Sequence, residues 1–419
     1  MRDPLDFLGS EWRRQGDLFS IRLPMFGELT YVADPEAVRQ IFSGDPTRFN
    51  AGEGNAEPLG PVLGENSLLT LDGDAHMAQR KLLLPPFHGE RIGAYADTMR
   101  AAAERELAAW PVGRPFALRP SMQRVTLEVI LRTVFGVSSR ERVERFERAI
   151  VHMASVSNMV LWAPWLRRNL GRLSPWNRFV RARAAVDELI YDEIRTRRAD
   201  PDFESREDVL SLLLQARHES GEPMTDVELR DELMTIVGAG HETTATALCW
   251  AFELLGRNPH VEERLRAELA SGDGDEYLDA VMKETLRIRP VVVDVVRKLL
   301  SDEEIGGHAI PAGTWLVPAI AVVHQRPDVY PQPHEFRPER FLEGQPEPYT
   351  WIPFGGGVRR CIGASFAQME IKIMLRALLS GARLRPASAR PEKARAKHVT
   401  IVPSRGARVV LEERLRPAG

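Results

Sequence analysis

Helical periodicity dominates the middle of the chain. From about residue 74 to residue 269, apolar positions recur at the three- and four-residue spacing of amphipathic helices. Separate helices are expected near residues 91–110, 121–135, 140–152 and 178–198. A longer run begins at Asp226, with Thr225 as its expected N-cap, and continues to Arg257. This run is well beyond the mean helix length of about 12 residues, so it is predicted to cross the molecule.

Period-two alternation predicts small β elements toward both ends. The stretches DLFSIRL and ELTYVAD are typical of paired strands around a turn, and DPEAVRQIF then begins as a capped helix. Strand-like stretches return at residues 294–300, 314–323 and 407–411. No internal repeat or compositional break marks a boundary. The predicted fold class is therefore mainly α with small β-sheets (α+β), in one domain over residues 1–419.

The proline-rich segment at residues 324–353 has two readings. Its composition is typical of a flexible linker. However, Phe336, Phe341, Tyr349 and Trp351 provide more apolar surface than a disordered spacer carries. We therefore expect an ordered meander here.

Composition narrows the function classes. The 419 residues carry a formal net charge of -3, with acidic and basic residues mixed throughout, so no nucleic-acid partner is expected. Cys249 and Cys361 are the only cysteines, which excludes a disulfide framework and a multi-cysteine zinc site and fits a reducing cytosol. No apolar run approaches the roughly 20 residues of a membrane span, and the first residues lack a signal-peptide pattern. The sequence thus predicts a cytoplasmic protein without a membrane anchor.

The stretch FGGGVRRCIG places Cys361 among glycines and arginines. Gly355–Gly357 would let the backbone approach something flat and large, while Arg359 and Arg360 favour a thiolate. The following residues have helical spacing, so free N–H groups at that helix start would further stabilise a negatively charged sulfur. Cys249, within TALCWAF, is interpreted as a buried packing residue instead. A thiol hydrolase would need a histidine base, and none lies nearby in sequence, although a spatial partner stays open.

This stretch resembles the haem-binding loop of the cytochrome P450 superfamily. The family pattern of Phe, two residues, Gly, one, Arg, one, Cys, one, Gly is matched by Phe354, Gly357, Arg359, Cys361 and Gly363. The resemblance implies that Cys361 is the proximal thiolate ligand of haem b (iron protoporphyrin IX) and that Arg359 pairs with a haem propionate. It also implies the family's fold, with a long central helix over the haem. The chain is most similar to the soluble bacterial branch.

Inside the long helix, AGHETTAT places Ala239 and Thr243 on one face with Gly240 and Glu242 beside them. A crossing of two helices would also use small residues. However, Gly240 costs about 1 kcal/mol relative to alanine, and Thr243 can bond to backbone carbonyls and open the helix. The segment resembles the family's oxygen-binding groove. This implies that Glu242 and Thr243 are catalytic, organising water and delivering protons, and that Ala239 and Gly240 leave room for oxygen.

KETLR and RPERF resemble the family's buried structural triad. The resemblance implies that Arg287 and Arg340 both bind Glu284. By itself, the Glu284–Arg287 pair at i, i+3 is more often an exposed helix pair. The triad's implied role is structural, not catalytic.

HMAQR resembles the family's propionate-binding helix. His76 and Arg80 lie four residues apart, on one helical face, and Arg297 follows the triad helix at another propionate position of the family. A surface pair would be the ordinary reading of His76 and Arg80 alone. With Arg359, these three residues are the implied propionate set.

Substrate contacts are expected, by the same resemblance, from segments over the distal face of the haem. The candidates are Leu68, Leu69, Val156, Met159, Ile236, Val292, Val293, Asp294 and Ile401. For each of them, ordinary core packing is the alternative. Asp294, inside VVVDVV, either anchors a polar substrate group or binds backbone.

The resemblance implies a monooxygenase that inserts one oxygen atom from O2 into a hydrophobic small molecule, such as a fatty acid, terpenoid or steroid-like compound. A peroxide-driven haem enzyme and a haem-based binding or sensor protein are the alternatives. Glu242 and Thr243 favour the monooxygenase, because a carrier or sensor needs no proton-delivery pair. The chain has no cysteine cluster and no glycine-rich dinucleotide fingerprint. Electrons are therefore expected from a separate ferredoxin or flavodoxin with its NAD(P)H-dependent reductase.

Overall fold

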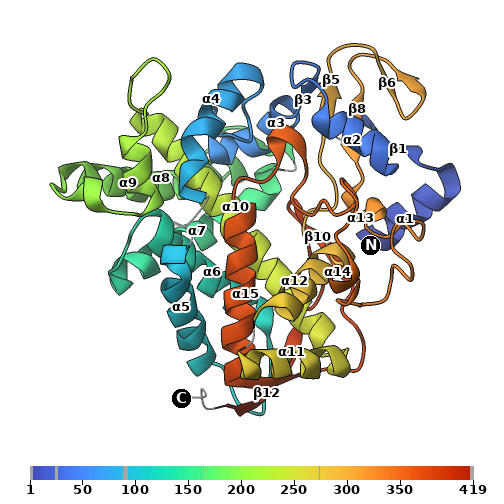
Figure 1. Ribbon diagram of the computed structural model, residues 1–419. Coiled ribbons are helices and arrows are strands. Elements are labelled where there is room, and N and C mark those ends of the chain that lie inside the picture. The colour runs from blue at the N-terminus through green and yellow to red at the C-terminus, as the bar shows by residue number, and fades with distance from the viewer. Residues whose placement is uncertain (1–2, 24–26, 88–92, 162, 273, 416–419) are drawn as a thin grey trace. The chain divides into compact units, whose positions relative to one another are not determined.

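The computed structural model describes residues 3–23, 27–87, 93–161, 163–272 and 274–415 (Figure 1). Backbone contacts group the chain into two compact units, each built from separate stretches of sequence. Unit 1 comprises residues 1–49, 99–125 and 242–419, and unit 2 comprises residues 50–98 and 126–241. Three of the boundaries fall inside helices, namely α5 (Ala96–Ala108), α6 (Leu118–Val134) and α10 (Asp226–Leu255), so each of these helices belongs in part to both units.

A five-stranded sheet begins unit 1, with the strand order β1-β2-β8-β5-β3. The strands are β1 (Leu18–Leu23), β2 (Gly27–Val32), β8 (Trp315–Pro318), β5 (Arg297–Leu299) and β3 (Phe49–Asn50). β1 and β2 form the antiparallel pair expected from their alternating sequence, with Leu18 opposite Val32. β8 runs parallel to β2 and antiparallel to β5.

Two apolar cores lie on the two faces of this sheet, because successive strand residues point to opposite sides. One core packs Phe19 and Ile21 of β1 against helix α1 (Pro4–Gln15). The other packs Leu316 of β8 against helix α2 (Pro35–Ser43). Asp34 caps α2 as the sequence predicts, since its side chain accepts a hydrogen bond from the Ala37 N–H at 2.8 Å.

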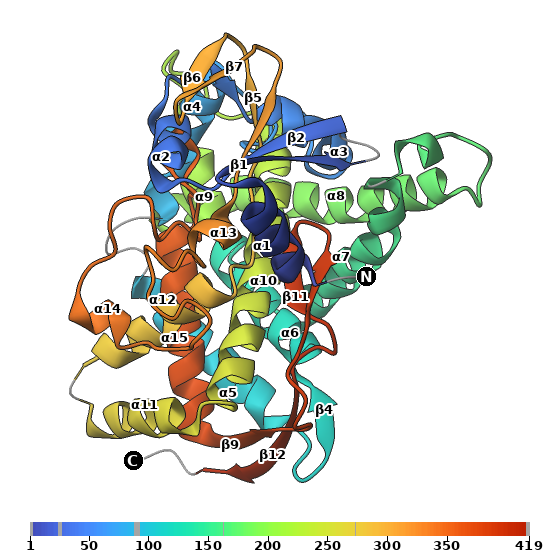
Figure 2. The same ribbon diagram turned by 90° about the vertical axis from the view of Figure 1, so that its right-hand side faces the viewer.

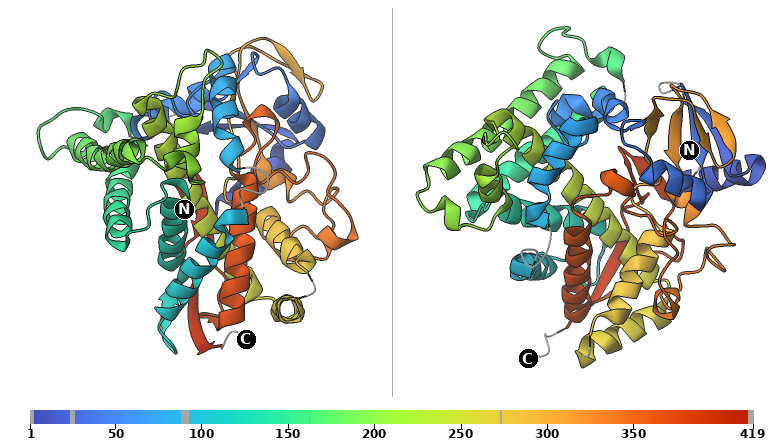
Figure 3. Two further views of the ribbon diagram at one scale, coloured as in Figure 1. Left: turned by 60° about the vertical axis from the view of Figure 1, so that its left-hand side comes forward. Right: turned by 45° about the horizontal axis from the view of Figure 1, so that its top comes forward.

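Helices and short sheets make up the rest of unit 1 (Figures 1 and 3). The helices are α11 (Pro259–Ser271), α12 (Glu276–Ile288), α13 (Ile320–Val323), α14 (Arg340–Glu343) and α15 (Ala364–Gly381), and α5 (Ala96–Ala108) begins in unit 2 and continues into unit 1. One sheet pairs β12 (Arg408–Arg414) with β4 (Pro115–Ala117) and β9 (Ala382–Pro386). Two hairpins pair β10 (Ala394–Lys397) with β11 (Thr400–Pro403) and β6 (Glu303–Ile305) with β7 (His308–Ile310).

Unit 2 is built mainly of helices. They are α3 (Gly52–Leu63), α4 (Gly73–Leu83), α7 (Arg140–Leu161), α8 (Pro175–Ala199), α9 (Val209–Gln215) and the parts of α5, α6 and α10 that belong to this unit. α7 and α8 pack against each other as a pair (Figure 2). The buried Arg197 of α8 forms an ion pair with Asp208 and donates to the Phe135 carbonyl at 2.8 Å. This arginine therefore joins α8, α9 and the end of α6.

The long helix and its cap are predicted correctly by the sequence. α10 begins at Asp226 and ends at Leu255, two residues before the expected end. At its start, the Glu228 N–H donates to the Thr225 hydroxyl at 3.2 Å, and the Thr225 N–H donates to the Glu228 carboxylate at 2.8 Å. This reciprocal pair is a capping box. The four shorter helices also form, as α5, α6, α7 and α8.

Some of the expected boundaries are wrong. The strand expected at residues 314–323 is correct only for β8, because Ile320–Val323 forms the helical turn α13. A short apolar run does not distinguish a strand from a buried helix. Only residues 297–299 of the stretch 294–300 are a strand, and α7 continues to Leu161 instead of ending near residue 152. The start of the helix expected at residue 91 lies outside the described residues.

Candidate active site

Cys361 lies in the turn before α15, in unit 1. Its backbone N–H donates to the Phe354 carbonyl at 2.9 Å, which closes the loop from Phe354 to Cys361. The Cys361 side chain is exposed, whereas Cys249 is buried and burial raises the pKa of its thiol. Of the two cysteines, Cys361 is therefore the one that a ligand can reach, as the sequence predicts.

Helix α2 explains two of the glycines in this loop. A Cβ atom on Gly357 would lie 1.7 Å from the Phe42 carbonyl oxygen, and one on Gly356 would lie 2.6 Å from the Phe42 ring. Gly357 also has a φ of 63°, a left-handed conformation that glycine adopts without strain. The close neighbour of these two glycines within the protein is α2. At Gly355 and at Gly363 an added Cβ would meet nothing within 4 Å.

Phe42 also contacts one of the expected propionate ligands. The Arg297 guanidinium lies 5.7 Å from the centre of the Phe42 ring and donates to the Val296 carbonyl at 2.8 Å. Arg297 is buried, and Arg359 is half-buried at the end of a 3-10 turn in the cysteine loop. Because Phe42 touches both Arg297 and the glycines of the loop, α2 holds Arg297 and the loop on the same part of unit 1.

Glu284 binds both arginines of the expected triad. Arg287 donates to its two carboxylate oxygens at 2.7 and 2.8 Å, and Arg340 donates at 3.1 Å. The backbone N–H of Arg337 adds a further bond at 2.9 Å. Glu284 and Arg287 are both 0% exposed. The three side chains thus form one buried charged network, whose bidentate geometry is that of a strong ion pair.

This network anchors the proline-rich segment at residues 324–353. Arg287 also donates to the carbonyl oxygens of His324 and Pro333, at 2.7 and 2.9 Å. The buried His324 ring accepts the Ile352 N–H at 2.9 Å, and burial lowers the pKa of this ring to about 3, so the imidazole is neutral. The segment is therefore an ordered meander, as expected, and it leads directly into the cysteine loop.

α10 is buried along most of its length and uncovered in the middle. Residues 229–237 and 244–255 are buried, whereas Gly238 and Ala239 are exposed and the next four residues are half-buried. In unit 2, the Thr126 hydroxyl of α6 donates to the His241 carbonyl at 2.9 Å. A Cβ on Gly240 would lie 2.8 Å from the end of the Ile130 side chain. The absence of a side chain at Gly240 therefore lets α6 approach α10.

Both oxygens of the Glu242 carboxylate are held by α6, in unit 1. Arg119 forms an ion pair with one oxygen, and the Gln123 side-chain amide donates to the other. The Arg119 and Glu242 side chains are each only 14% exposed. Sequence reasoning missed Arg119 and Gln123, because nothing in the local pattern of α6 distinguishes them from ordinary polar residues of an amphipathic helix.

The hairpin of β10 and β11 adds two titratable groups near this pair. Burial is the largest cause that lowers the pKa values of Lys397 and His398, and the positive charge of Arg119 lowers both further. The Glu242 carboxylate acts in the opposite direction on both groups. Glu242 therefore lies in a partly buried cluster of charges, not in contact with Arg119 alone.

The expected substrate residues of unit 1 lie together, but two of them belong to the core. The Ile401 N–H donates to the Val291 carbonyl at 2.8 Å, which joins the two segments. Val293 and Ile401 are part of the apolar core beside the five-stranded sheet, whereas Val292 and Asp294 are half-buried. Core packing, the alternative reading, thus applies to Val293 and Ile401.

Asp294 binds a side chain. The Tyr31 hydroxyl donates to its carboxylate at 3.1 Å. Burial raises the pKa of Asp294, and the Tyr31 hydrogen bond opposes this rise. The partner that the structure gives Asp294 is thus a tyrosine side chain and not backbone, and its role in anchoring substrate stays a prediction.

Unit 2 contains the other expected site residues. His76 and Arg80 lie on α4, with His76 buried and Arg80 half-buried. The expected substrate residues Leu68 and Ile236 are buried, Leu69 and Val156 are half-buried, and the Met159 side chain lies outside the described residues. The Thr235 hydroxyl of α10 donates to the Ser67 hydroxyl at 2.7 Å. This bond places the loop of Leu68 and Leu69 beside α10.

Two fully buried glutamates were not anticipated. Burial raises the pKa of Glu232 on α10 and of Glu370 on α15 to about 8 in each case. Hydrogen-bonding groups of Gln79 and Leu68 oppose the rise at Glu232, and Thr244 opposes it at Glu370. Both carboxyl groups are therefore largely neutral at pH 7.

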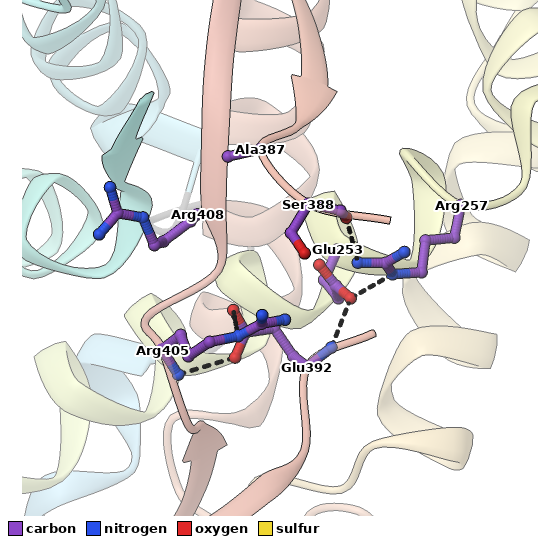
Figure 4. A pocket seen from close by; sticks show the side chains of 7 residues that line it. All are labelled: Glu253, Arg257, Ala387, Ser388, Glu392, Arg405 and Arg408. Carbon is purple, nitrogen blue, oxygen red and sulfur yellow. Dashed lines mark hydrogen bonds and ion pairs between the residues drawn. The ribbon is translucent and has the colours of Figure 1, made fainter. Parts of the chain in front are cut away.

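A polar pocket of about 200 Å³ lies elsewhere in unit 1 (Figure 4). It is lined by Glu253, Arg257, Ala387, Ser388, Glu392, Arg405 and Arg408. Arg257 is paired with Glu253, and Arg405 lies 3.5 Å from Glu392. None of the expected site residues lines this pocket, and its charges largely satisfy one another.

The described residues contain no group of three or more His, Cys, Asp or Glu side chains placed to hold a metal ion. None of the helices described here is long and apolar enough to cross a membrane.

The chain is similar to known proteins over almost its whole length. Residues 11–409 match the family model described as Cytochrome P450. The putative cytochrome P450 135B1 of Mycobacterium tuberculosis is 44% identical over 417 residues, which cover 98% of this chain and 87% of that protein. The putative cytochrome P450 138 of Mycobacterium bovis is 39% identical over 97% of this chain and 91% of that protein.

Solved structures share the fold. A retinoic acid-bound cyanobacterial CYP120A1 superimposes with a TM-score of 0.84 at 27% identity, covering 98% of this chain and 94% of that chain. The heme domain of cytochrome P450DA superimposes with a TM-score of 0.87 at 24% identity, covering 100% and 94% of the two chains. The mainly helical fold with small sheets, predicted from the sequence, is confirmed.

Proposed function

The chain belongs to the cytochrome P450 family and is a haem-thiolate monooxygenase, and we propose that Cys361 is the thiolate ligand of its haem iron. One observation carries this assignment: Cys361 is an exposed thiol at the start of α15, in a loop that matches the family's ligand motif. The donor set fits a haem, since Arg359 and Arg360 precede the sulfur and the N-terminus of α15 follows it. When bound, haem supplies the activation of O2.

The form of haem we propose is haem b. Its two propionates need cationic or hydrogen-bonding partners, and the family pattern assigns His76, Arg80, Arg297 and Arg359 to them. The position of Arg297 supports this role, because it is buried beside Phe42, on the same part of unit 1 as the cysteine loop.

Proton delivery is proposed for Glu242 and Thr243. Both lie in the uncovered middle of α10, where side chains are half-buried. The Glu242 carboxyl group would take up a proton from water and pass it toward the Thr243 hydroxyl or toward water between them. Arg119 and Gln123 hold Glu242 in place and keep it from turning freely.

The substrate class we propose is a hydrophobic small molecule such as a fatty acid, terpenoid or steroid-like compound. Most of the candidate contact residues are apolar, and Val292 and Leu69 remain partly accessible. The cyanobacterial relative with bound retinoic acid, an apolar terpenoid acid, supports this class. Electrons would come from a separate ferredoxin or flavodoxin with its NAD(P)H-dependent reductase, in the cytoplasm.

The carbon monoxide spectrum of the reduced protein tests the assignment of Cys361. The wild type and a Cys249→Ala control should both show a thiolate-type absorption band. Cys361→Ala should lose this band, and Cys361→His should replace it with a histidine-type spectrum. An unaltered thiolate spectrum in Cys361→Ala, or its loss in Cys249→Ala alone, would contradict the assignment.

A further inference from the structure

The hairpin of β10 and β11 follows α10 within unit 1 (Figure 2). At the base of the hairpin, the Glu392 N–H donates to the Glu253 carboxylate of α10 at 2.9 Å, and the Arg405 N–H donates to the Glu392 carboxylate at 2.7 Å. Farther along, the Trp250 side chain of α10 donates to the Ile401 carbonyl at 2.8 Å. The hairpin therefore extends from Glu253 toward the earlier residues of α10.

The tip of the hairpin reaches the level of Glu242. Glu242 lies eleven residues before Glu253, which is about three turns along the same face of α10 and a distance of about 16 Å. Six residues lead from Glu392 to His398, and an extended strand of this length spans about 20 Å. The hairpin is thus long enough to place His398 beside Glu242. In agreement, the negative charge of Glu242 acts on the pKa of His398 and raises it, against the burial that lowers it.

His398 has an unusual backbone conformation. In the hairpin Lys397 pairs with Thr400, so His398 and Val399 form the turn. The φ of His398 is 53°, in the left-handed region that residues other than glycine seldom adopt. Strained conformations of this kind collect at functional sites. The strain therefore suggests a role for the side chain at position 398.

Three enclosed polar atoms lie near the Glu242 side chain. They are Nε2 of His398, Nε of Arg119 and Oγ1 of Thr246, and each is buried without a hydrogen-bond partner among the residues that the structure describes. Arg119 forms an ion pair with Glu242, and Thr246 follows Glu242 by one helical turn on the same face. Folded proteins seldom leave buried polar atoms unpaired. A group of such atoms in one place is suited to proton transfer, either directly or through a water that bonds to two to four of them.

The His398 ring is neutral at pH 7. Burial is the largest cause that lowers its pKa, the positive charges of Lys397 and Arg119 also lower it, and Glu242 opposes them. These charges come from the hairpin itself, from α6 and from α10. A neutral imidazole carries a proton on one nitrogen and accepts one on the other. Because His398 is half-buried and its Nε2 is enclosed, the residue reaches both water and the interior of unit 1.

We propose that His398 passes protons from solvent to Glu242. The ring nitrogen that faces water accepts a proton, and the Nε2–H proton moves to a Glu242 oxygen, directly or through one water. One proton enters the ring and one leaves it, and a half-turn of the ring restores the starting tautomer. This step rests on the proposed function, in which Glu242 passes the proton onward to Thr243. His398 acts through Glu242 and is therefore a relay residue at the solvent side of the path.

Nuclear magnetic resonance of the full chain with haem tests the contact without turnover. The protein is labelled with ¹⁵N-histidine and kept in the reduced, carbon monoxide-bound form, and His398→Asn identifies the His398 signal by its loss. In Glu242→Gln the pKa of His398 should fall below its value in the wild type, because the negative charge that raises it is gone. Glu304→Gln, at an exposed position on β6, is the control and should leave this pKa unchanged. An unchanged pKa in Glu242→Gln would overturn the proposal.

The pH profile of coupling tests the relay itself. Asparagine adopts a positive φ readily, so His398→Asn should keep the turn and remove the proton-carrying ring. With a fatty acid as the probe substrate, product per NAD(P)H should fall by about tenfold at pH 8 and by less at pH 6, where protons from water are more abundant. In the wild type this ratio should change little over the same range. His308→Asn, at an exposed histidine of the other hairpin, is the control and should behave as the wild type.

The competing outcomes are distinct. A pH-dependent loss of coupling in Lys397→Gln but not in His398→Asn would assign the relay to the lysine and overturn the proposal. Loss of haem or of the carbon monoxide spectrum in His398→Asn would overturn it in favour of a structural role. Uncoupling by Glu242→Ala, with His398→Asn fully coupled at every pH, would overturn the His398 step alone. Full coupling in both variants would also overturn the proton relay of the proposed function.

Discussion

Arg119 on α6 holds the carboxylate of Glu242 on α10, a residue 123 positions later in the chain. The acid expected to deliver protons is thus already paired with a cation. A paired carboxylate keeps its position, but it can take up a proton and pass it on only when the pair loosens or a water reaches it. Arg119 is therefore a positioning residue for the proposed proton relay, acting through Glu242.

Replacing Arg119 should uncouple oxygen use from product formation. Arg119→Gln keeps a hydrogen-bond donor but removes the charge, so Glu242 loses its ion pair and its fixed orientation. We expect a several-fold fall in product formed per NAD(P)H consumed, with haem content unchanged. Arg124 lies on α6 like Arg119 and pairs with Glu106 of α5. Arg124→Gln is therefore the control, and its oxygen use should stay coupled to product formation. Equal coupling in both variants would show that Arg119 has no part in the relay.

Removing the relay residues themselves should have a larger effect. Glu242→Ala or Thr243→Ala should lower the rate of product formation by about 10²-fold or more, the usual contribution of general acid catalysis. Hydrogen peroxide should appear in place of product, because proton delivery fails while electrons still arrive. Steady-state product and peroxide assays measure both. Loss of haem from either variant would instead assign Glu242 or Thr243 a structural role.

The triad should control folding rather than chemistry. Glu284→Gln leaves the buried Arg287 and Arg340 without a counter-charge, which costs about 3–5 kcal/mol of unfolding free energy. The meander held by Arg287 would loosen, and the cysteine loop after it would lose haem. Denaturant unfolding and haem content per chain check this. Glu339→Gln is the control, because Glu339 pairs with Arg264 and is more exposed than Glu284. It should lower the unfolding free energy by less than about 1 kcal/mol.

The sequence predicts the parts of the candidate site that local patterns encode. The α10 capping box, the β1–β2 pairing and the position of Cys361 before α15 all depend on residues close together in the chain. The contacts of Glu284 with Arg287 and Arg340 also agree with the expected triad, because the family motifs identify these residues although they are distant in sequence. The expected single domain stays a prediction, since the backbone contacts group the chain into two units whose sequences interleave.

The misses concern partners that no local pattern specifies. Arg119, Gln123 and Tyr31 acquire their roles only when another segment folds beside them. The contact of Gly356 and Gly357 with α2 was not foreseen for the same reason, since α2 is far away in sequence. The turn of α13 was missed because an apolar run of buried residues carries no period.

Glu370 should make stability depend on pH. In the folded state burial raises the pKa of this carboxyl to about 8, while its ordinary value is 4.5. Between these two values the folded protein holds the proton more tightly than the unfolded chain, so this group's contribution to stability falls as pH rises. The slope is at most about 1.4 kcal/mol per pH unit. The stability of Glu370→Gln, whose side chain stays neutral, should depend less on pH between 5 and 8 than the stability of the wild type.

Denaturant unfolding at several pH values measures this difference. Between pH 5 and pH 8, the unfolding free energy of the wild type should fall further than that of Glu370→Gln. The gap between these two changes should be largest at pH 8. Thr244→Val is a second test, because it removes the hydroxyl that opposes the rise in pKa. A constant difference between wild type and Glu370→Gln across this range would show that Glu370 ionises normally.

Reduction should require another protein. The chain has no cysteine cluster for an iron–sulfur centre and no dinucleotide fingerprint, and two electrons are needed in each turnover. NADPH with the isolated protein should give no product, and a ferredoxin with its reductase should restore turnover.

Arg360 is exposed beside Cys361, so Arg360→Gln should slow electron transfer several-fold. Added salt should slow electron transfer in the wild type more than in the variant. Arg383→Gln, at an exposed position on β9, is the control and should behave as the wild type. Robust turnover with NADPH alone would refute the need for a partner, whereas reduction that ignores salt would refute only its electrostatic docking at Arg360.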